Sequence, residues 1–346
     1  MTTIHDVARV AGVSISTASY ALNGKGSVAP ATRRRIQRAA EKLDYKTNAR
    51  ARAFASGRTS ILAVTEPLRA DTFTSNHMAF VLAAAKAARR YDYDILLLTQ
   101  EEAAGGLRRV TSGGTVDGIV ILDVLTHDER VELARTLKVP SVVVGVPADT
   151  AGLVCVDLDF VAAGRMAVQR LAQAGHRRIG FIGHPAASYR PEASNFPPRL
   201  RTGLTEEAGR LGVAVDTVTP EVDYRTARRT VTELLSVREP PTALVLHAHE
   251  EAHTAALEAL ADLGRTVPDD VSLISVAQTF DTARFSPAID AVPLVAERSC
   301  ERATELLLAM IDGDVEPRLE LLSPFYVDHG SVRRPPGTAG PPATPT

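Results

Sequence analysis

The sequence has few of the features that define secreted, membrane-spanning or disulfide-stabilised proteins. Its 346 residues include only two cysteines, Cys155 and Cys300, too few for a disulfide framework or a four-cysteine zinc site. No run of about 18 apolar residues exists, so we expect no membrane span. The first residues lack the basic and apolar regions of a secretory signal. These absences favour a cytoplasmic protein with both cysteines reduced, and the length of the chain suggests two or three domains.

The chain also has little net charge, and the formal value of -2 argues at first against a nucleic-acid partner. The charge is unevenly distributed, however. Residues 1–58 carry eleven cations and three anions, a balance of +8, whereas the remaining residues carry 28 cations and 38 anions, a balance of -10. A basic segment joined to an acidic body is typical of a nucleic-acid-binding module. A solvated basic face is the alternative interpretation of the charge alone.

Two short helices joined by a tight turn are expected near the start of the chain. Apolar residues between positions 4 and 11 recur every three or four residues, which predicts one helix face. Thr3 and Asp6 have the spacing of a capping box. Gly12 is expected to end the first helix and Ser14 to cap the second. The pattern predicts a helix-turn-helix.

The second helix is expected to bury its alanines and to leave its other face exposed. That face combines small hydroxyl groups with one branched apolar side chain and one tyrosine, at Ile15, Ser16, Ser19 and Tyr20. Such groups suit the base edges and thymine methyl groups of a DNA major groove. The alternative is that Ile15 and Tyr20 pack on a neighbouring element.

A third helix and a short alanine-rich segment complete the basic region. The third helix follows Pro30, and its arginines suit contacts to DNA phosphates. Residues 48–57 contain alanine and arginine but only one large apolar side chain, Phe54, so a helix there is marginal alone. It is expected to order on DNA, with Phe54 as a wedge between base steps. The alternative is a plain linker with Phe54 packed on the next domain.

From residue 60 onward, apolar strand-like runs alternate with amphipathic helical stretches. The predicted strands are Ile61–Thr65, Ile95–Thr99, Gly118–Leu122, Ser141–Val146, Ile179–Ile182, Ala243–Leu246 and Val271–Val276. The predicted helices include Met78–Arg90, Val161–Ala174, Arg225–Leu235 and Glu250–Leu263. This alternation predicts an α/β fold of two doubly wound parallel-sheet lobes. A ligand is then expected in the cleft between them, at the carboxyl ends of the strands.

The segments Thr3–Ser14 and Thr17–Gly24 closely resemble the opening of LacI-family (lactose-repressor-like) bacterial transcriptional regulators. The similarity continues through residues 28–45 and 48–57, and then through Gly175–Gly183 and Val267–Ser272, so that it spans roughly residues 3–330. It implies a helix-turn-helix headpiece on a two-lobed core like that of periplasmic binding proteins, which dimerises and binds an effector. It also implies repression of transcription at a near-palindromic operator in double-stranded DNA, by a homodimer or possible tetramer.

The resemblance also implies which residues contact DNA. Ile15, Ser16 and Tyr20 would read the major groove, and Phe54 would occupy the position of the minor-groove wedge, where the family usually has leucine. Thr47 stands where the family has proline, and Tyr20 where arginine is common. The candidate DNA-contacting residues are Thr3, Ser14, Ile15, Ser16, Thr17, Ser19, Tyr20, Asn23, Arg33, Asn48, Arg50 and Phe54.

The implied effector cleft departs from sugar-binding members of the family. Gly145 stands where an acid is often found, His249 and Glu250 replace an Asn-Asp pair, and Ala277 and Gln278 replace an Asp-Asp pair. Sugar hydroxyls need paired carboxylates and amides, so these changes argue against an ordinary sugar site. A cleft without a physiological ligand is the alternative. The candidate cleft residues are Phe73, Asp123, Arg199, Arg201, His249 and Gln278.

One short motif suggests a different function, zinc-dependent hydrolysis. Residues 249–253 fit the pattern H-E-x-x-H, which on a helix can bind zinc with the glutamate as a base. No third ligand is evident, and no phosphate-binding loop or nucleophile elbow accompanies it, so we expect neither an enzyme nor a cofactor. A zinc hydrolase and a transport-type solute-binding protein are the other classes considered; the second would need an export signal and no headpiece.

The chain is therefore expected to divide into four segments. Residues 1–46 are expected to form the headpiece, residues 47–58 a hinge helix, and residues 59–332 the effector-binding and dimerisation core. Residues 333–346 are rich in proline and glycine and have little to bury, so they are expected to be a disordered tail.

Overall fold

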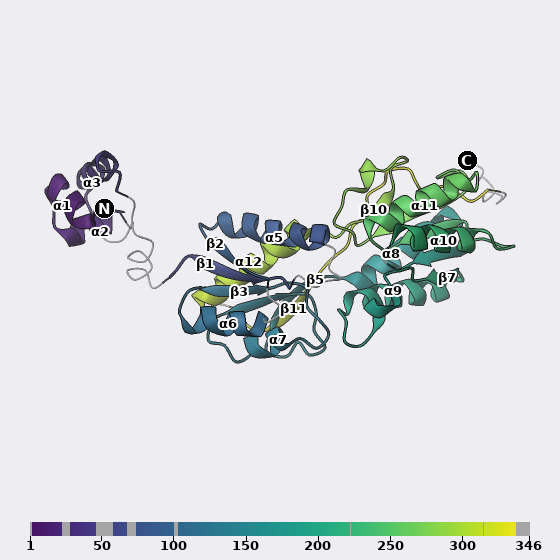
Figure 1. The fold of residues 1–346 in the computed structure, drawn as a ribbon, viewed down its shortest axis with the longest axis horizontal. Coiled ribbons are helices and arrows are strands. Elements are labelled where there is room, and N and C mark those ends of the chain that lie inside the picture. The colour runs from purple at the N-terminus through teal and green to yellow at the C-terminus, as the bar shows by residue number, and fades with distance from the viewer. Residues whose placement is uncertain are drawn as a thin grey trace, which may run out of the picture.

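The computed structural model describes residues 2–22, 28–45, 58–67, 74–99, 103–221, 223–313 and 315–336. Within these ranges the chain forms a small helical headpiece and two α/β lobes (Figure 1). None of the helices within these ranges is long and apolar enough to cross a membrane.

The headpiece is the predicted helix-turn-helix followed by a third helix. Its elements are α1 (Ile4–Ala11), α2 (Ile15–Leu22) and α3 (Pro30–Lys42). The capping box between Thr3 and Asp6 is present, and Gly12 ends α1 at a φ of 63°, a left-handed conformation that glycine adopts without strain. Apolar residues of all three helices are buried together, among them Val7, Ala18 and Ile36. This small core confirms the periodicity read from the sequence.

The first lobe is a parallel sheet of six strands in the order β11-β5-β4-β3-β1-β2. The strands are β1 (Ile61–Thr65), β2 (Asp94–Leu98), β3 (Gly118–Ile121), β4 (Ser141–Val144), β5 (Val154–Leu158) and β11 (Arg318–Leu322). The helices of this lobe are α5 (Thr74–Arg89), α6 (Ala103–Ser112), α7 (Glu129–Ala134) and α12 (Ala296–Asp312). Leu62 and Val64 of β1 pack on the side of α5 and α12, whereas Ala63 packs on the side of α6 and α7. Because both faces are covered, the central strands β1, β3 and β4 are almost wholly apolar.

The second lobe is a parallel sheet of five strands in the order β10-β9-β8-β6-β7. The strands are β6 (Arg178–Ile182), β7 (Ala214–Val218), β8 (Ala243–Leu246), β9 (Ser272–Val276) and β10 (Asp290–Val292). The helices are α8 (Phe160–Ala174), α9 (Phe196–Leu211), α10 (Tyr224–Leu235) and α11 (Glu250–Asp262), with short 3-10 turns η1 (Ala186–Tyr189) and η2 (Thr282–Arg284). Helices α8 and α9 cover one face of the sheet, and α10 and α11 cover the other.

The chain passes between the lobes three times. It leaves the first lobe after β5, returns after β10 to form α12 and β11, and then crosses again to the second lobe, where Val327 bridges to Ala291 beside β10 (Figure 1). Direct contacts also join the lobes: the Thr126 amide donates to the Ala193 carbonyl, and the Thr279 hydroxyl donates to the Asn76 side-chain oxygen at 3.0 Å. The carboxyl ends of both sheets therefore face a shared cleft.

Two sequence expectations concern single residues or short segments of this fold. Cys155 and Cys300 are buried and free, and burial raises the pKa of each thiol to about 12. The prediction that the chain is disordered from residue 333 onward is wrong for residues 333–336. The Arg333 amide donates to the Ser272 hydroxyl at 3.0 Å, and Pro335 is buried, because this segment packs beside β9. Residues 337–346 lie outside the described ranges.

Candidate DNA-binding surface and ligand cleft

The exposed face of α2 presents the side chains expected to read DNA. Ile15 is 44% exposed and Tyr20 is 53% exposed, although both are large and apolar or amphipathic. Ser16 is also exposed, and Ser19 is partly exposed on the same helix. Within the described residues the alternative, in which Ile15 and Tyr20 pack on a neighbour, is therefore wrong. The exposed face of α2 is therefore a candidate recognition surface.

Hydroxyl groups at the start of both helices hold the turn in place. The Ser14 hydroxyl accepts a hydrogen bond from the Thr17 amide at 3.1 Å and shares a second one with the Thr17 hydroxyl. This is the predicted N-cap of α2. The amide and hydroxyl of Thr3 both donate to the Asp6 carboxylate. These hydrogen bonds cap the first turn of each helix.

Positive charge lies on the exposed surface of α3 in the same headpiece. Arg34, Arg35 and Arg38 are exposed, whereas Arg33 is only partly exposed. Guanidinium groups at the surface of the helix suit phosphate contacts that position a protein on a duplex. Four other candidates, Asn23, Asn48, Arg50 and Phe54, lie outside the described residues, as does nearly all of the predicted hinge. Arg58, directly after the hinge, forms an ion pair with Asp312 at the end of α12.

The second candidate site is a cavity of about 160 Å³ between the lobes. Three of the predicted cleft residues line it: Asp123, His249 and Gln278. The cavity lies at the carboxyl ends of the strands, as expected of doubly wound sheets. Its lining also includes groups that sequence reasoning missed, among them Glu66, His77, Asp157 and His184. Of these, Glu66 carried a usable signal, because it directly follows a predicted strand.

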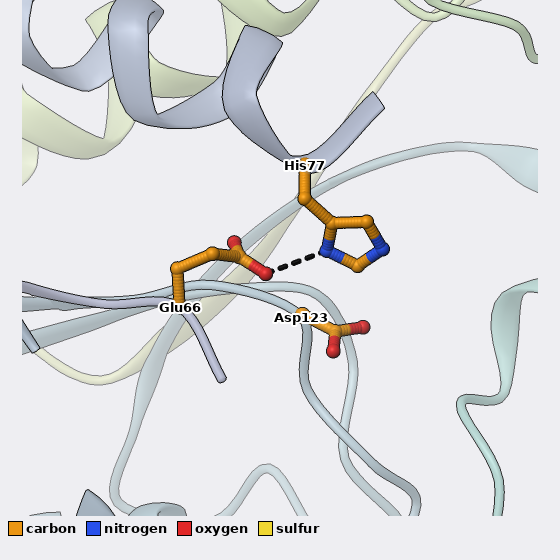
Figure 2. A group of neighbouring side chains, drawn as sticks. All are labelled: Glu66, His77 and Asp123. Carbon is orange, nitrogen blue, oxygen red and sulfur yellow. Dashed lines mark hydrogen bonds and ion pairs between the residues drawn. The ribbon is translucent and has the colours of Figure 1, made fainter. Parts of the chain in front are cut away.

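Glu66, His77 and Asp123 meet on the first-lobe wall of the cavity (Figure 2). Glu66 follows β1, Asp123 follows β3 in the neighbouring position of the sheet, and His77 reaches down from α5. His77 Nδ1 and Glu66 Oε1 are hydrogen-bonded at 2.6 Å. Burial raises the pKa of the Glu66 carboxyl, and the bond to His77 opposes that shift. One ligand atom from each of the three residues lies within 4.8 Å of the others.

The backbone of the cavity wall adopts conformations that are uncommon for side-chain-bearing residues. Asp123 has a φ of 46° and Ala277 a φ of 56°, and such strain clusters at functional sites. Gly145 has a φ of 130°, and a Cβ there would lie 3.2 Å from the Val124 Cβ. The acid that the family often has at Gly145 would therefore be strained here.

Arg199 contributes to the cleft indirectly. Its Nη1 donates to Asp157 Oδ2 at 2.6 Å, and its guanidinium also packs over the Phe160 ring. Burial raises the pKa of Asp157 to about 6, and the charge of Arg199 opposes the shift. Asp157 lines the cavity, and Arg199 pairs with it from behind the wall. Because Asp157 belongs to β5 of the first lobe and Arg199 to α9 of the second, this ion pair joins the two lobes.

Gln278, Arg201 and Phe73 complete the set of predicted cleft residues, and of the two within the described ranges only Gln278 is among the lining residues. Gln278 is 4% exposed and donates to the Val276 carbonyl, which fixes its amide at the wall. Arg201 lies over the Tyr189 ring, 4.2 Å from its centroid, and is not among the lining residues. It follows Arg199 by two positions on α9, so the helix turns its side chain away. Phe73 lies outside the described residues.

Histidines form the second-lobe wall. The rings of His184 and His249 pack edge to face with centroids 5.0 Å apart, and His247 lies behind them, 4.5 Å from His184. Burial, with a contribution from His77 across the cavity, lowers the pKa of His249 to about 4. The lining is therefore rich in imidazole and carboxylate groups.

The H-E-x-x-H pattern does not form a zinc site. His249 precedes α11, whereas His253 is fully buried inside it. His253 Nδ1 bonds the His249 carbonyl oxygen at 3.0 Å, and its Nε2 bonds the Ser275 hydroxyl at 2.9 Å. Both ring nitrogens are thus occupied within the protein, and the pattern has a structural explanation.

Comparisons with known proteins agree with this architecture. Residues 3–48 match the bacterial regulatory proteins of the lacI family, and residues 168–332 match a periplasmic binding protein-like domain. The HTH-type transcriptional regulator AglR of Rhizobium meliloti (strain 1021) is 29% identical over 320 residues, covering 88% of this chain and 85% of AglR.

Two solved structures extend the comparison to three dimensions. The structure of a CelR–cellobiose complex is 26% identical, with a TM-score of 0.64, and the alignment covers 96% of this chain and 100% of that one. A Lac repressor dimer bound to operator and an anti-inducer is 20% identical with a TM-score of 0.77, and the alignment covers 96% of this chain and 99% of that one. The latter likeness concerns the fold alone.

A helix-turn-helix headpiece joined to a two-lobed core with a cavity is the architecture of a DNA-binding transcription regulator. The chain belongs to the LacI family of bacterial regulatory proteins. Members of this family are DNA-binding transcription regulators, and the predicted family and fold class are confirmed.

Proposed function

We propose that this protein is a homodimeric repressor that binds a near-palindromic operator and responds to a small molecule held between its lobes. It acts on double-stranded DNA in the bacterial cytoplasm, with residues 1–46 as the reader, residues 47–58 as a hinge helix and the following residues as the core. In this proposal Phe54 inserts between base steps at the operator centre. We assign it no enzymatic activity and no cofactor.

The observation that supports DNA reading most strongly is the exposed face of α2. Ile15 and Tyr20 remain about half exposed although burial would be favourable, as expected if DNA rather than protein covers them. The arginines of α3 supply phosphate contacts beside it. A transport-type solute-binding protein has no use for such a headpiece.

Dimer formation is supported by the exposed apolar surface of the first lobe. Leu82 on α5 is 57% exposed, and Leu319 and Leu321 on the edge strand β11 are about 40% exposed. Two copies of the headpiece explain a two-fold operator, because each recognition helix occupies one half-site. A ligand that binds one arrangement of the lobes better than another then changes the fraction of dimers able to bind DNA.

The CelR structure contains cellobiose, which makes a polyhydroxy effector one candidate class for this cleft. The lining of this cavity is richer in histidine, however, with His77, His184 and His249 facing it. We therefore propose a small polar effector of a different chemistry from a plain disaccharide.

Selection from a pool of random DNA duplexes with the full chain tests the DNA-binding part. We expect a near-palindromic sequence bound by two chains, measured by sequencing and by the mass of the complex. Deleting residues 1–58 is expected to abolish that binding. Equal affinity of the shortened protein, or a selected sequence without two-fold symmetry, would contradict the proposal.

A further inference from the structure

Glu66, His77 and Asp123 form a cluster that the proposed DNA-binding function does not explain. All three side chains face the inter-lobe cavity from the first lobe, and they converge from three separate elements (Figure 2). Glu66 is only 1% exposed. A buried carboxylate beside an imidazole and a second carboxylate is a costly arrangement unless a cation or hydrogen bonds compensate it.

The charge balance of the cavity favours a cation. Among the described residues that line it, Glu66, Asp123 and Asp157 are acidic and none is a lysine or arginine. Asp157 is compensated by Arg199 at 2.6 Å. Arg130, whose charge also acts on Glu66, is held by Asp128 at 2.6 Å.

We infer that Glu66, His77 and Asp123 bind a divalent transition-metal ion, and that this ion is a regulatory ligand of the cleft. An imidazole nitrogen with two carboxylates suits zinc, nickel, cobalt or iron, whereas magnesium and calcium prefer oxygen ligands alone. An organic amine, the other class of cation, would bind to the two carboxylates and would not need the imidazole. The identity of the donor atoms thus selects the class of cation.

The geometry is close to that of a metal site. Bonds of about 2.1 Å in a tetrahedral site place ligand atoms roughly 3.4 Å apart. The three ligand atoms here lie within 4.8 Å of one another, and the His77–Glu66 pair is at 2.6 Å. A metal ion would replace the hydrogen in that pair, and the two side chains would separate by less than about 1 Å.

Three protein ligands leave at least one coordination position open toward the cavity. His249, at the amino-terminal end of α11 in the second lobe, lines the same cavity and is the candidate for a fourth ligand. A metal ion that takes three ligands from one lobe and a fourth from the other binds closed lobes more tightly than open ones. Its binding would therefore shift the population of lobe arrangements that controls the headpieces.

Direct binding measurements on the full chain, stripped with a chelator, test the metal site. Titration with Zn²⁺, Ni²⁺ and Co²⁺ by calorimetry is expected to give one ion per chain, and bound Co²⁺ is expected to absorb visible light. The substitutions Glu66→Gln, His77→Gln and Asp123→Asn keep side-chain size but remove a ligand. Each is expected to weaken binding at least about tenfold.

His127→Gln is the matched control, because His127 is an exposed histidine of the same lobe. It is expected to bind metal as the parent does. Thermal unfolding of each metal-free variant reports separately whether the fold is intact. No saturable binding, or equal binding by folded Glu66→Gln and the parent, would overturn the metal site.

The regulatory part rests on the proposed function and needs its own measurement. Operator affinity is expected to change roughly 5- to 150-fold when metal is added to the parent, and to stay constant in Glu66→Gln. Stoichiometric metal binding with unchanged operator affinity would overturn the regulatory role alone. Failure of the chain to bind DNA both with and without metal would instead contradict the proposed function.

Discussion

Tyr20 is the most exposed of the large side chains that α2 presents, and it belongs to a helix whose opposite face is buried. We predict that Tyr20→Ala weakens binding to the selected operator by about 1–3 kcal/mol, while binding to an unrelated duplex changes little, because a base contact is lost. Unfolding free energy should be unaffected. Fluorescence anisotropy with both duplexes and a denaturation curve measure these quantities.

Arg34→Ala provides the contrast, because Arg34 is exposed on α3 and is suited to phosphates. Its loss should weaken binding to both duplexes alike and lower the slope of log K against log salt by about one. If Tyr20→Ala instead reduced both affinities equally, a base-reading role for Tyr20 would be wrong.

The residues of the two sites were predictable to different degrees. Helical periodicity was enough to place Ile15 and Tyr20 on an exposed face, since only the spacing along one helix mattered. Asp123 and His249 were found because they follow strands or stand at family positions. His77 was missed, because its meeting with Glu66 depends on how α5 lies across the end of β1, a relation between elements that no local pattern records.

At the scale of elements, the contact between α8 and α9 depends on two glycines. A Cβ on Gly203 would lie 2.0 Å from the Val161 carbonyl oxygen, and a Cβ on Gly164 would lie 2.3 Å from the Leu200 carbonyl oxygen. The helix backbones therefore touch directly. This contact holds α9, with Arg199 and Phe196, at the edge of the cavity.

We predict that Gly203→Ala lowers the unfolding free energy by roughly 3 kcal/mol or more, because the added methyl group must push two helices apart. Gly209→Ala on the same helix is the control, since a Cβ there meets nothing within 4 Å. It should stabilise the protein by up to about 1 kcal/mol through helix propensity. Urea denaturation measures both, and similar behaviour of the two variants would contradict this account of the contact.

Strands were predicted with nearly correct bounds where burial on both faces of a sheet gives the sequence an unbroken apolar run. Strands β1 and β8 have the predicted bounds, and β3, β4 and β9 differ by one or two residues at one end. The apolar pattern did not predict β5, β7, β10 or β11, and in β5 Asp157 interrupts the apolar run. Strand β10 has only three residues, and β7 and β11 are edge strands in which polar residues interrupt the apolar pattern.

At the scale of the whole molecule, the buried histidines make stability depend on pH. Burial lowers the pKa of His247 to about 3 and of His253 to about 4, and it places that of His184 well below its usual value. In the unfolded chain each titrates near a pKa of about 6.5. The folded protein therefore binds fewer protons than the unfolded chain between these values, so stability is complete above about pH 6.5 and is lost as the pH falls.

We predict that His247 and His253 each contribute a loss of about 1.4 kcal/mol of unfolding free energy between about pH 7.5 and 5.5 in the metal-free protein, or about 3 kcal/mol together. That is a large share of the roughly 5–15 kcal/mol typical of a folded domain. His247→Leu should reduce the loss by about 1.4 kcal/mol, because both ring nitrogens of His247 are buried without a hydrogen-bond partner among the described residues. Exposed His127→Leu should leave it unchanged. Urea denaturation of the full chain at the two pH values measures these changes in unfolding free energy. If the unfolding free energies of the parent and of His247→Leu changed equally with pH, the proposed contribution of His247 would be wrong.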